Sequence, residues 1–157
     1  MKAVIQRVSH AEVQVDGETV GACGRGFLIL LGVAEGDTEA EVELLCRKTF
    51  GLRIFPDEEG KMNRSIKEID GEVLVISQFT LLANCRRGNR PDFLASAKPE
   101  VANALYEGFK QRLAQELRRV ECGVFGAHME VSLCNDGPVT ILLDTDALKA
   151  PKSQANF

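Results

Sequence analysis

Histidine is scarce in this sequence of 157 residues, and several other chemical signals are missing. Only His10 and His128 occur, so a Ser-His-Asp hydrolase or a histidine-rich metal site would have to use one of them. The ordinary interpretation of each is a surface or strand histidine. The cysteine count is odd, and no C-x-x-C pair is found among positions 23, 46, 85, 122 and 134. We therefore expect no disulfide framework, no zinc knuckle and no metal or other cofactor.

Long apolar runs and nucleotide-binding motifs are absent as well. No stretch of about 18 apolar residues is present, which predicts that no segment spans a membrane. Residues 1–7 lack the charged and apolar regions of a signal peptide, so we expect a cytoplasmic protein. No G-x-G-x-x-G, Walker, G-x-S-x-G, H-E-x-x-H or EF-hand pattern occurs.

The composition is that of one folded domain with a local basic segment. Apolar residues make up 45% and charged residues 27%, which is enough to bury a core. We expect one domain over residues 1–146, followed by a polar tail over residues 147–157. The net charge of −4 excludes a general polycation, but Arg86, Arg87 and Arg90 cluster in one loop. This loop is either a solvated surface segment or a contact for the phosphates of a nucleic acid.

Hydrophobic patterning predicts a fold that is mainly β, with two helices. Thr38 and Glu41 have capping-box spacing and begin a helix that ends near Gly51, and Pro99 begins a second helix that runs to about Arg119. A turn is predicted at 135–138, and strands are predicted at 3–8, 12–15, 26–33, 71–81, 129–133 and 139–143. This order does not alternate regularly, so we expect an α/β, mainly β fold. It is a mixed sheet curled into a β-barrel-like core, with both helices on its outside.

Two polar segments are candidates for chemistry. Ser77-Gln78-Phe79-Thr80 ends a buried strand with two hydroxyls and an amide, which cost about 1 to 3 kcal/mol each if they are buried without partners. The plain alternative is a strand end whose polar groups bind neighbouring backbone. Asn135-Asp136-Gly137-Pro138-Val139-Thr140 is the second segment. Gly137 has no Cβ and allows a ligand to approach closely, but this segment taken alone favours an ordinary turn.

Together these two segments resemble the signature pair of the D-aminoacyl-tRNA deacylases. The similarity also includes Ile5-Gln6-Arg7-Val8, Gly60-Lys61-Met62-Asn63, Gly88-Asn89-Arg90-Pro91 and Phe125-Gly126-Ala127-His128-Met129. It covers the chain to about Thr145. Two separated motifs in the right order make this a specific signal.

The resemblance implies a homodimer that hydrolyses the ester between a D-amino acid and the 3′-terminal adenosine of tRNA. Such enzymes also remove glycine from mischarged tRNA and reject L-aminoacyl esters. The resemblance assigns the catalytic segment to Ser77, Gln78, Phe79 and Thr80. Backbone N–H groups near Phe79 and Thr80 would stabilise the oxyanion while the ribose 2′-OH assists water.

The resemblance further assigns substrate binding to five residues. Gly137 and Pro138 would form a cis dipeptide that enters the partner subunit's site, where their carbonyls bind the substrate's α-amine and block an L side chain. Arg7 would orient the Ser77 segment, and Phe125 and Met129 would line the site. In this family His128 has no chemical role.

Two other functions fit the residues alone. One is a β-rich dimer without catalysis that binds RNA or another protein. The other is an esterase with Thr80 as nucleophile, although no obvious base activates this hydroxyl.

Overall fold

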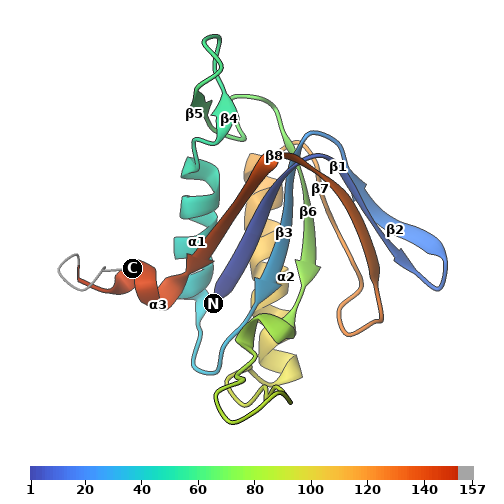
Figure 1. The fold of residues 1–157 in the computed structure, drawn as a ribbon, viewed down its shortest axis with the longest axis vertical. Coiled ribbons are helices and arrows are strands. Elements are labelled where there is room, and N and C mark those ends of the chain that lie inside the picture. The colour runs from blue at the N-terminus through green and yellow to red at the C-terminus, as the bar shows by residue number, and fades with distance from the viewer. Residues whose placement is uncertain (152–157) are drawn as a thin grey trace.

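A computed structural model describes residues 1–151 of the chain (Figure 1). Its elements in chain order are β1 (Lys2–Val15), β2 (Glu18–Cys23), β3 (Gly26–Gly32), α1 (Glu39–Gly51), β4 (Phe55–Pro56), β5 (Met62–Arg64), β6 (Glu72–Ser77), the 3-10 helix η1 (Phe79–Leu82), α2 (Pro99–Glu116), β7 (Val120–Cys122), β8 (Glu130–Asp144) and α3 (Thr145–Lys149). The domain boundary predicted at residue 146 falls inside α3. Residues 152–157 of the predicted tail lie outside the described residues.

One mixed sheet of six strands forms the centre of the fold. Its order is β2-β1-β3-β6-β7, and β8 pairs with β1 from Lys2 to Gln14, with the pairing interrupted between Gln6 and His10. β1 is antiparallel to β2, β3 and β8, whereas β3, β6 and β7 run parallel. The sheet curls until β2 reaches β7, where the carboxylate of Glu121 accepts a hydrogen bond from the Ala22 N–H at 2.6 Å. A Cβ on Gly21 would lie 2.5 Å from the Cys122 carbonyl oxygen, so glycine permits this close approach.

Both faces of the central strands are buried, as the continuous apolar run at 26–33 predicts. Phe27, Ile29 and Leu31 of β3 face the two long helices, while Leu28 belongs to a second cluster on the opposite face. Figure 1 shows α1 and α2 side by side across one face of the sheet. The predicted fold class, with two helices outside a curled mixed sheet, is confirmed. Thr38 and Glu41 form the predicted capping box of α1.

The predicted turn at 135–138 is wrong. The chain does not reverse there, because residues 130–144 form the single strand β8. Gln6 pairs with Thr140 and Val8 pairs with Asn135, so five residue steps on β8 face two on β1. The extra residues Asp136–Pro138 project from the ladder, and we call them the bulge. Turn-forming residues serve here to expel a segment from a strand that continues on both sides.

The strand predicted over 71–81 is also shorter than expected. β6 ends at Ser77, and the chain then tightens into η1. Conversely, the two strands predicted at 3–8 and 12–15 are the two ends of one long strand, β1.

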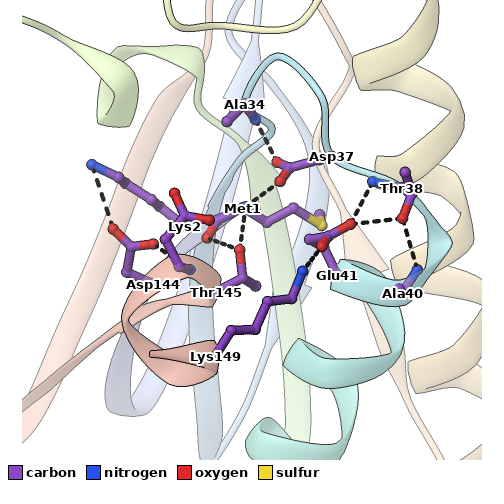
Figure 2. A network of polar contacts seen from close by, with 11 residues as sticks. Met1, Lys2, Ala34, Asp37, Thr38, Ala40, Glu41, Asp144, Thr145 and Lys149 are labelled. Atoms are coloured by element: carbon purple, nitrogen blue, oxygen red, sulfur yellow. Dashed lines mark hydrogen bonds and ion pairs between the residues drawn. The ribbon is translucent and has the colours of Figure 1, made fainter. Parts of the chain in front are cut away.

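The amino terminus ties three distant segments together (Figure 2). The α-ammonium group of Met1 is buried and donates to Asp37 at 2.7 Å and to Thr145 at 2.6 Å. Lys149 on α3 pairs with Glu41 on α1 beside it. These contacts hold α3 and the end of β8 against the segment that leads into α1.

Candidate active site

Residues 77–80 lie where β6 leaves the sheet. The Gln78 N–H donates to the Leu31 carbonyl at 2.8 Å, which fixes the chain against the parallel neighbour β3. A Cβ on Gly32 would lie 2.6 Å from Leu82 and 3.0 Å from the Gln78 carbonyl oxygen. Because Gly32 has no side chain, η1 can lie directly against the end of β3. The sequence thus places this segment at the edge of the core.

A cavity of about 940 Å³ opens beside this segment, and its wall extends from the sheet face opposite the helices to Pro99 and Ala102 at the start of α2. Residues 77–80 and 125–129 both line it, so the structure brings together two segments that are distant in sequence. The rest of its wall is mainly apolar and includes Leu28, Leu30 and Ile76. A mainly apolar hollow with a few convergent polar groups is the usual form of a small-ligand site.

Only some of the polar groups of residues 77–80 form hydrogen bonds. Gln78 Nε2 donates to Thr80 Oγ1 at 3.0 Å, and the Phe79 carbonyl accepts from Ser96 at 3.4 Å. The N–H groups of Phe79 and Thr80 open η1 and have no acceptor among residues 1–151. Two adjacent free N–H groups at the wall of a cavity can stabilise an oxyanion. A strand end whose polar groups are all satisfied by neighbouring backbone does not describe this segment.

Aromatic side chains form part of the cavity wall. Phe79 is 57% exposed and makes an edge contact with Phe93, with 4.9 Å between the ring centroids. Phe125 packs against Tyr106, with 5.9 Å between the ring centroids. The Tyr106 hydroxyl donates to the Val75 carbonyl at 2.9 Å, and burial raises the pKa of this phenol well above its usual value. Tyr106 is therefore a neutral support for the wall.

Met129 lies in the same wall for a steric reason. A Cβ on Gly123 would lie 3.2 Å from Ile76, and it would also overlap the sulfur of Met129. The glycine therefore allows Met129 to lie against β6 beside the cavity.

His128 lines the cavity too, although no sequence pattern indicates a role for it there. It is the only ionisable side chain among the lining residues of the described chain. Thr80 lines the same cavity, but no hydrogen bond joins its side chain to His128 within residues 1–151. Within the same range, no group of three or more His, Cys, Asp or Glu could hold a metal ion.

Gly137 and Pro138 do not line this cavity. They are exposed in the bulge, the peptide bond between them is cis, and Gly137 has a φ of +151°. Arg7 binds the bulge through its side chain. Its guanidinium donates to the Asp136 carbonyl at 2.8 Å and to the Ile54 carbonyl at 2.5 Å, and it lies 3.6 Å from the Asp136 carboxylate. Within the described chain, the hydrogen bonds and the ion pair of the Arg7 side chain therefore go to the bulge and to Ile54.

The basic loop adjoins the cavity wall along the chain. Its two ends are joined by backbone hydrogen bonds between Asn84 and Asp92, next to Phe93 of the cavity wall. Arg86, Arg87 and Arg90 are exposed, and none of them forms an ion pair in the described chain.

No helix in the described part of the chain is long and apolar enough to cross a membrane.

Comparison with known proteins identifies the family. Residues 4–144 match the family model D-Tyr-tRNA(Tyr) deacylase. The chain is 56% identical over 154 residues to a D-aminoacyl-tRNA deacylase of Roseiflexus castenholzii, and the match covers 98% of both chains. A solved structure described as c-Myc DNA Unwinding Element Binding Protein is 44% identical. It has a TM-score of 0.87, and the match covers 92% of this chain and 98% of that one.

A second solved structure, a probable eukaryotic D-amino acid tRNA deacylase, is 17% identical, with a TM-score of 0.76 and coverage of 90% and 97%. It shows a shared fold. The family model and the relative of high identity together confirm the predicted family and its enzyme class. The chain therefore belongs to the D-Tyr-tRNA(Tyr) deacylase family.

Proposed function

We propose that this chain hydrolyses the ester that joins a D-amino acid, or glycine, to the 3′-terminal adenosine of tRNA, and that it rejects L-aminoacyl esters. The observation that carries this proposal is the pair of free N–H groups of Phe79 and Thr80 at the cavity wall. The family membership supports the same substrate class. We place the reaction in the cytoplasm.

The chemistry needs little from side chains, because an aminoacyl ester is already reactive. Water adds to the ester carbonyl, and the two N–H groups stabilise the resulting oxyanion. The ester C–O bond then breaks and releases the amino acid and the 3′-hydroxyl of tRNA. The neighbouring 2′-OH assists the proton transfers, while Ser77 and Gln78 hold the terminal adenosine or the carbonyl.

Chiral selection is assigned to the bulge of a partner subunit. In the single chain the bulge is exposed and lies outside the cavity, as expected for a segment that serves a second copy. The carbonyls of Gly137 and Pro138 bind the α-amine of the substrate. A hydrogen or a D side chain then points to open space, whereas an L side chain meets backbone.

The basic loop contacts the phosphates of the acceptor stem. Its attachment next to Phe93 of the cavity wall and the absence of ion pairs to Arg86, Arg87 and Arg90 in the described chain favour this role over that of a merely solvated loop. Such contacts release counterions and make activity sensitive to salt.

One rival mechanism has a specific observation in its favour. His128 in the cavity wall could activate Thr80 as a nucleophile, so that an acyl-enzyme forms. Two measurements separate the mechanisms. A substrate ending in 2′-deoxyadenosine should react much more slowly if the 2′-OH assists, while Thr80→Ala and His128→Gln should retain most of their turnover.

The opposite pattern contradicts the RNA-assisted mechanism. In that case Thr80→Ala abolishes turnover while tRNA binding stays intact, and the 2′-deoxy substrate reacts normally. A protein that binds tRNA and never releases amino acid from it would instead support the non-catalytic binding function.

A further inference from the structure

The bulge on β8 is held at both of its ends. Asn135 precedes it and Val139 follows it. The Asn135 side chain accepts from the Val139 N–H at 2.8 Å and donates to the Val139 carbonyl at 3.0 Å. A single amide therefore closes the base of the bulge much as a neighbouring strand would.

The amide of Gln6 joins the same two ends from the neighbouring strand. Its Oε1 accepts from Asn135 Nδ2 at 2.5 Å and from Thr140 Oγ1 at 2.6 Å. Asn135 and Thr140 are the residues at which the ladder with β1 stops and resumes. One acceptor oxygen thus fixes the separation between the two stems of the bulge.

Gln6 also borders the cavity of its own chain. The Gln6 side chain therefore lies beside the cavity of its own subunit. It also supports the bulge, which in the proposed function enters the cavity of the partner subunit. Arg7, the next residue along, holds the bulge through the Asp136 carbonyl, so the two residues grip different parts of it.

We propose that Gln6 is a positioning residue for stereochemical selection, since its amide oxygen fixes the two stems of the bulge that carries Gly137 and Pro138. This inference rests on the proposed function. Steric exclusion of an L side chain requires a rigid barrier, because a displacement of about 1 Å can cost a large factor in rate or selectivity. Gln6 acts through Asn135 and Thr140 and has no contact with the substrate in this role.

Substitutions at Gln6 separate its acceptor oxygen from its volume. Gln6→Met keeps the length of the side chain and removes the acceptor, whereas Gln6→Glu keeps an acceptor for both donors. The matched control is Gln14→Met on the same strand, which also pairs with β8 but lies at Glu130, away from the bulge. Circular dichroism establishes that each variant is folded.

Two readouts are measured for each protein. The first is the ratio of kcat/KM for D-tyrosyl-tRNA to kcat/KM for L-tyrosyl-tRNA, and the second is the exchange rate of the Val139 amide hydrogen. We expect Gln6→Met to lower the ratio about tenfold or more and to speed up exchange at Val139 about tenfold. Gln6→Glu and Gln14→Met should stay within about twofold of the wild type in both readouts.

An unchanged ratio in folded Gln6→Met overturns the inference and leaves the proposed function standing. A fall in the ratio that Gln14→Met shares equally also overturns it. If the wild type cleaves both esters equally, the proposed function and the role in selection both fail, and the exchange rate still decides whether Gln6 holds the bulge. If Gln6→Met does not fold, Thr140→Val removes one of the two donors, and we expect an effect of about threefold in the same direction.

Discussion

Replacing Gly137 with alanine tests the bulge where its backbone is crowded. Gly137 has a φ of +151°, which side-chain-bearing residues adopt at a cost of about 1–3 kcal/mol. An added Cβ would lie 2.7 Å from Val139 Cγ2 and 2.8 Å from the Val139 nitrogen, distances that normal Cβ atoms do not show. It would also lie 3.3 Å from Arg7 Nη2. The methyl group therefore strikes the stem of the bulge itself, and the bulge must move.

A cost of about 1–3 kcal/mol corresponds to a factor of about 5 to 150 in the population of the native bulge. We expect kcat/KM of Gly137→Ala for a D-aminoacyl-tRNA to fall at least about tenfold. Steady-state deacylation with D-tyrosyl-, L-tyrosyl- and glycyl-tRNA measures this effect. Gly36→Ala is the control, because Gly36 also has a positive φ, +86°, but among residues 1–151, apart from Gly36 and its two chain neighbours, no atom lies within 4 Å of an added Cβ. A folded Gly137→Ala enzyme with the rate and stereoselectivity of the wild type would show that the bulge does not act in selection.

Three further predictions concern stability and substrate binding. Thr49→Val should raise the free energy of unfolding by about 1 kcal/mol in a thermal melt, because the Thr49 hydroxyl is buried with no hydrogen-bond partner in the described chain. Glu121→Gln should lower the free energy of unfolding by about 1 kcal/mol at pH 7. The hydrogen bond from the Ala22 N–H, and to a smaller extent the one from Arg119, holds the pKa of the Glu121 carboxyl below its usual value. A depressed folded pKa gives stability that is present above the unfolded value of about 4.3 and is lost as the pH falls, so denaturant titrations should show the two proteins converging below about pH 4. Arg87→Gln combined with Arg90→Gln should raise KM for tRNA and lower the slope of log affinity against log salt by about 1 to 2, whereas a merely solvated loop predicts no change.

Most of the fold could be predicted because its signals are local. Alternating or continuous apolar runs indicate the central strands, and the capping box at Thr38 and Glu41 marks the start of α1. Pro99 likewise begins α2. The bulge could not be predicted, because Asn, Asp, Gly and Pro favour a turn and a bulge for the same conformational reasons. Only the pairing of both flanks with β1 decides between them, and pairing is a long-range property.

The candidate site was predictable only in part. The polar side chains within residues 77–80 can be recognised in the sequence. The family resemblance rests on their combination with residues 135–140. Leu28, Leu30 and Ile76 look like ordinary core residues, and only the curl of the sheet turns them into a cavity wall. His128 lines that wall because residues 125–129 pass it, which no local pattern indicates. The role of Gln6 depends on two hydrogen bonds across more than 100 residues of sequence.

A backbone barrier is proposed to select between mirror-image esters by shape. The most direct measurement is the hydrolysis of D-tyrosyl-tRNA and L-tyrosyl-tRNA by the purified protein under identical conditions. Steric selection predicts rapid release of D-tyrosine and no release of L-tyrosine above the spontaneous rate. Equal rates for the two esters would contradict it.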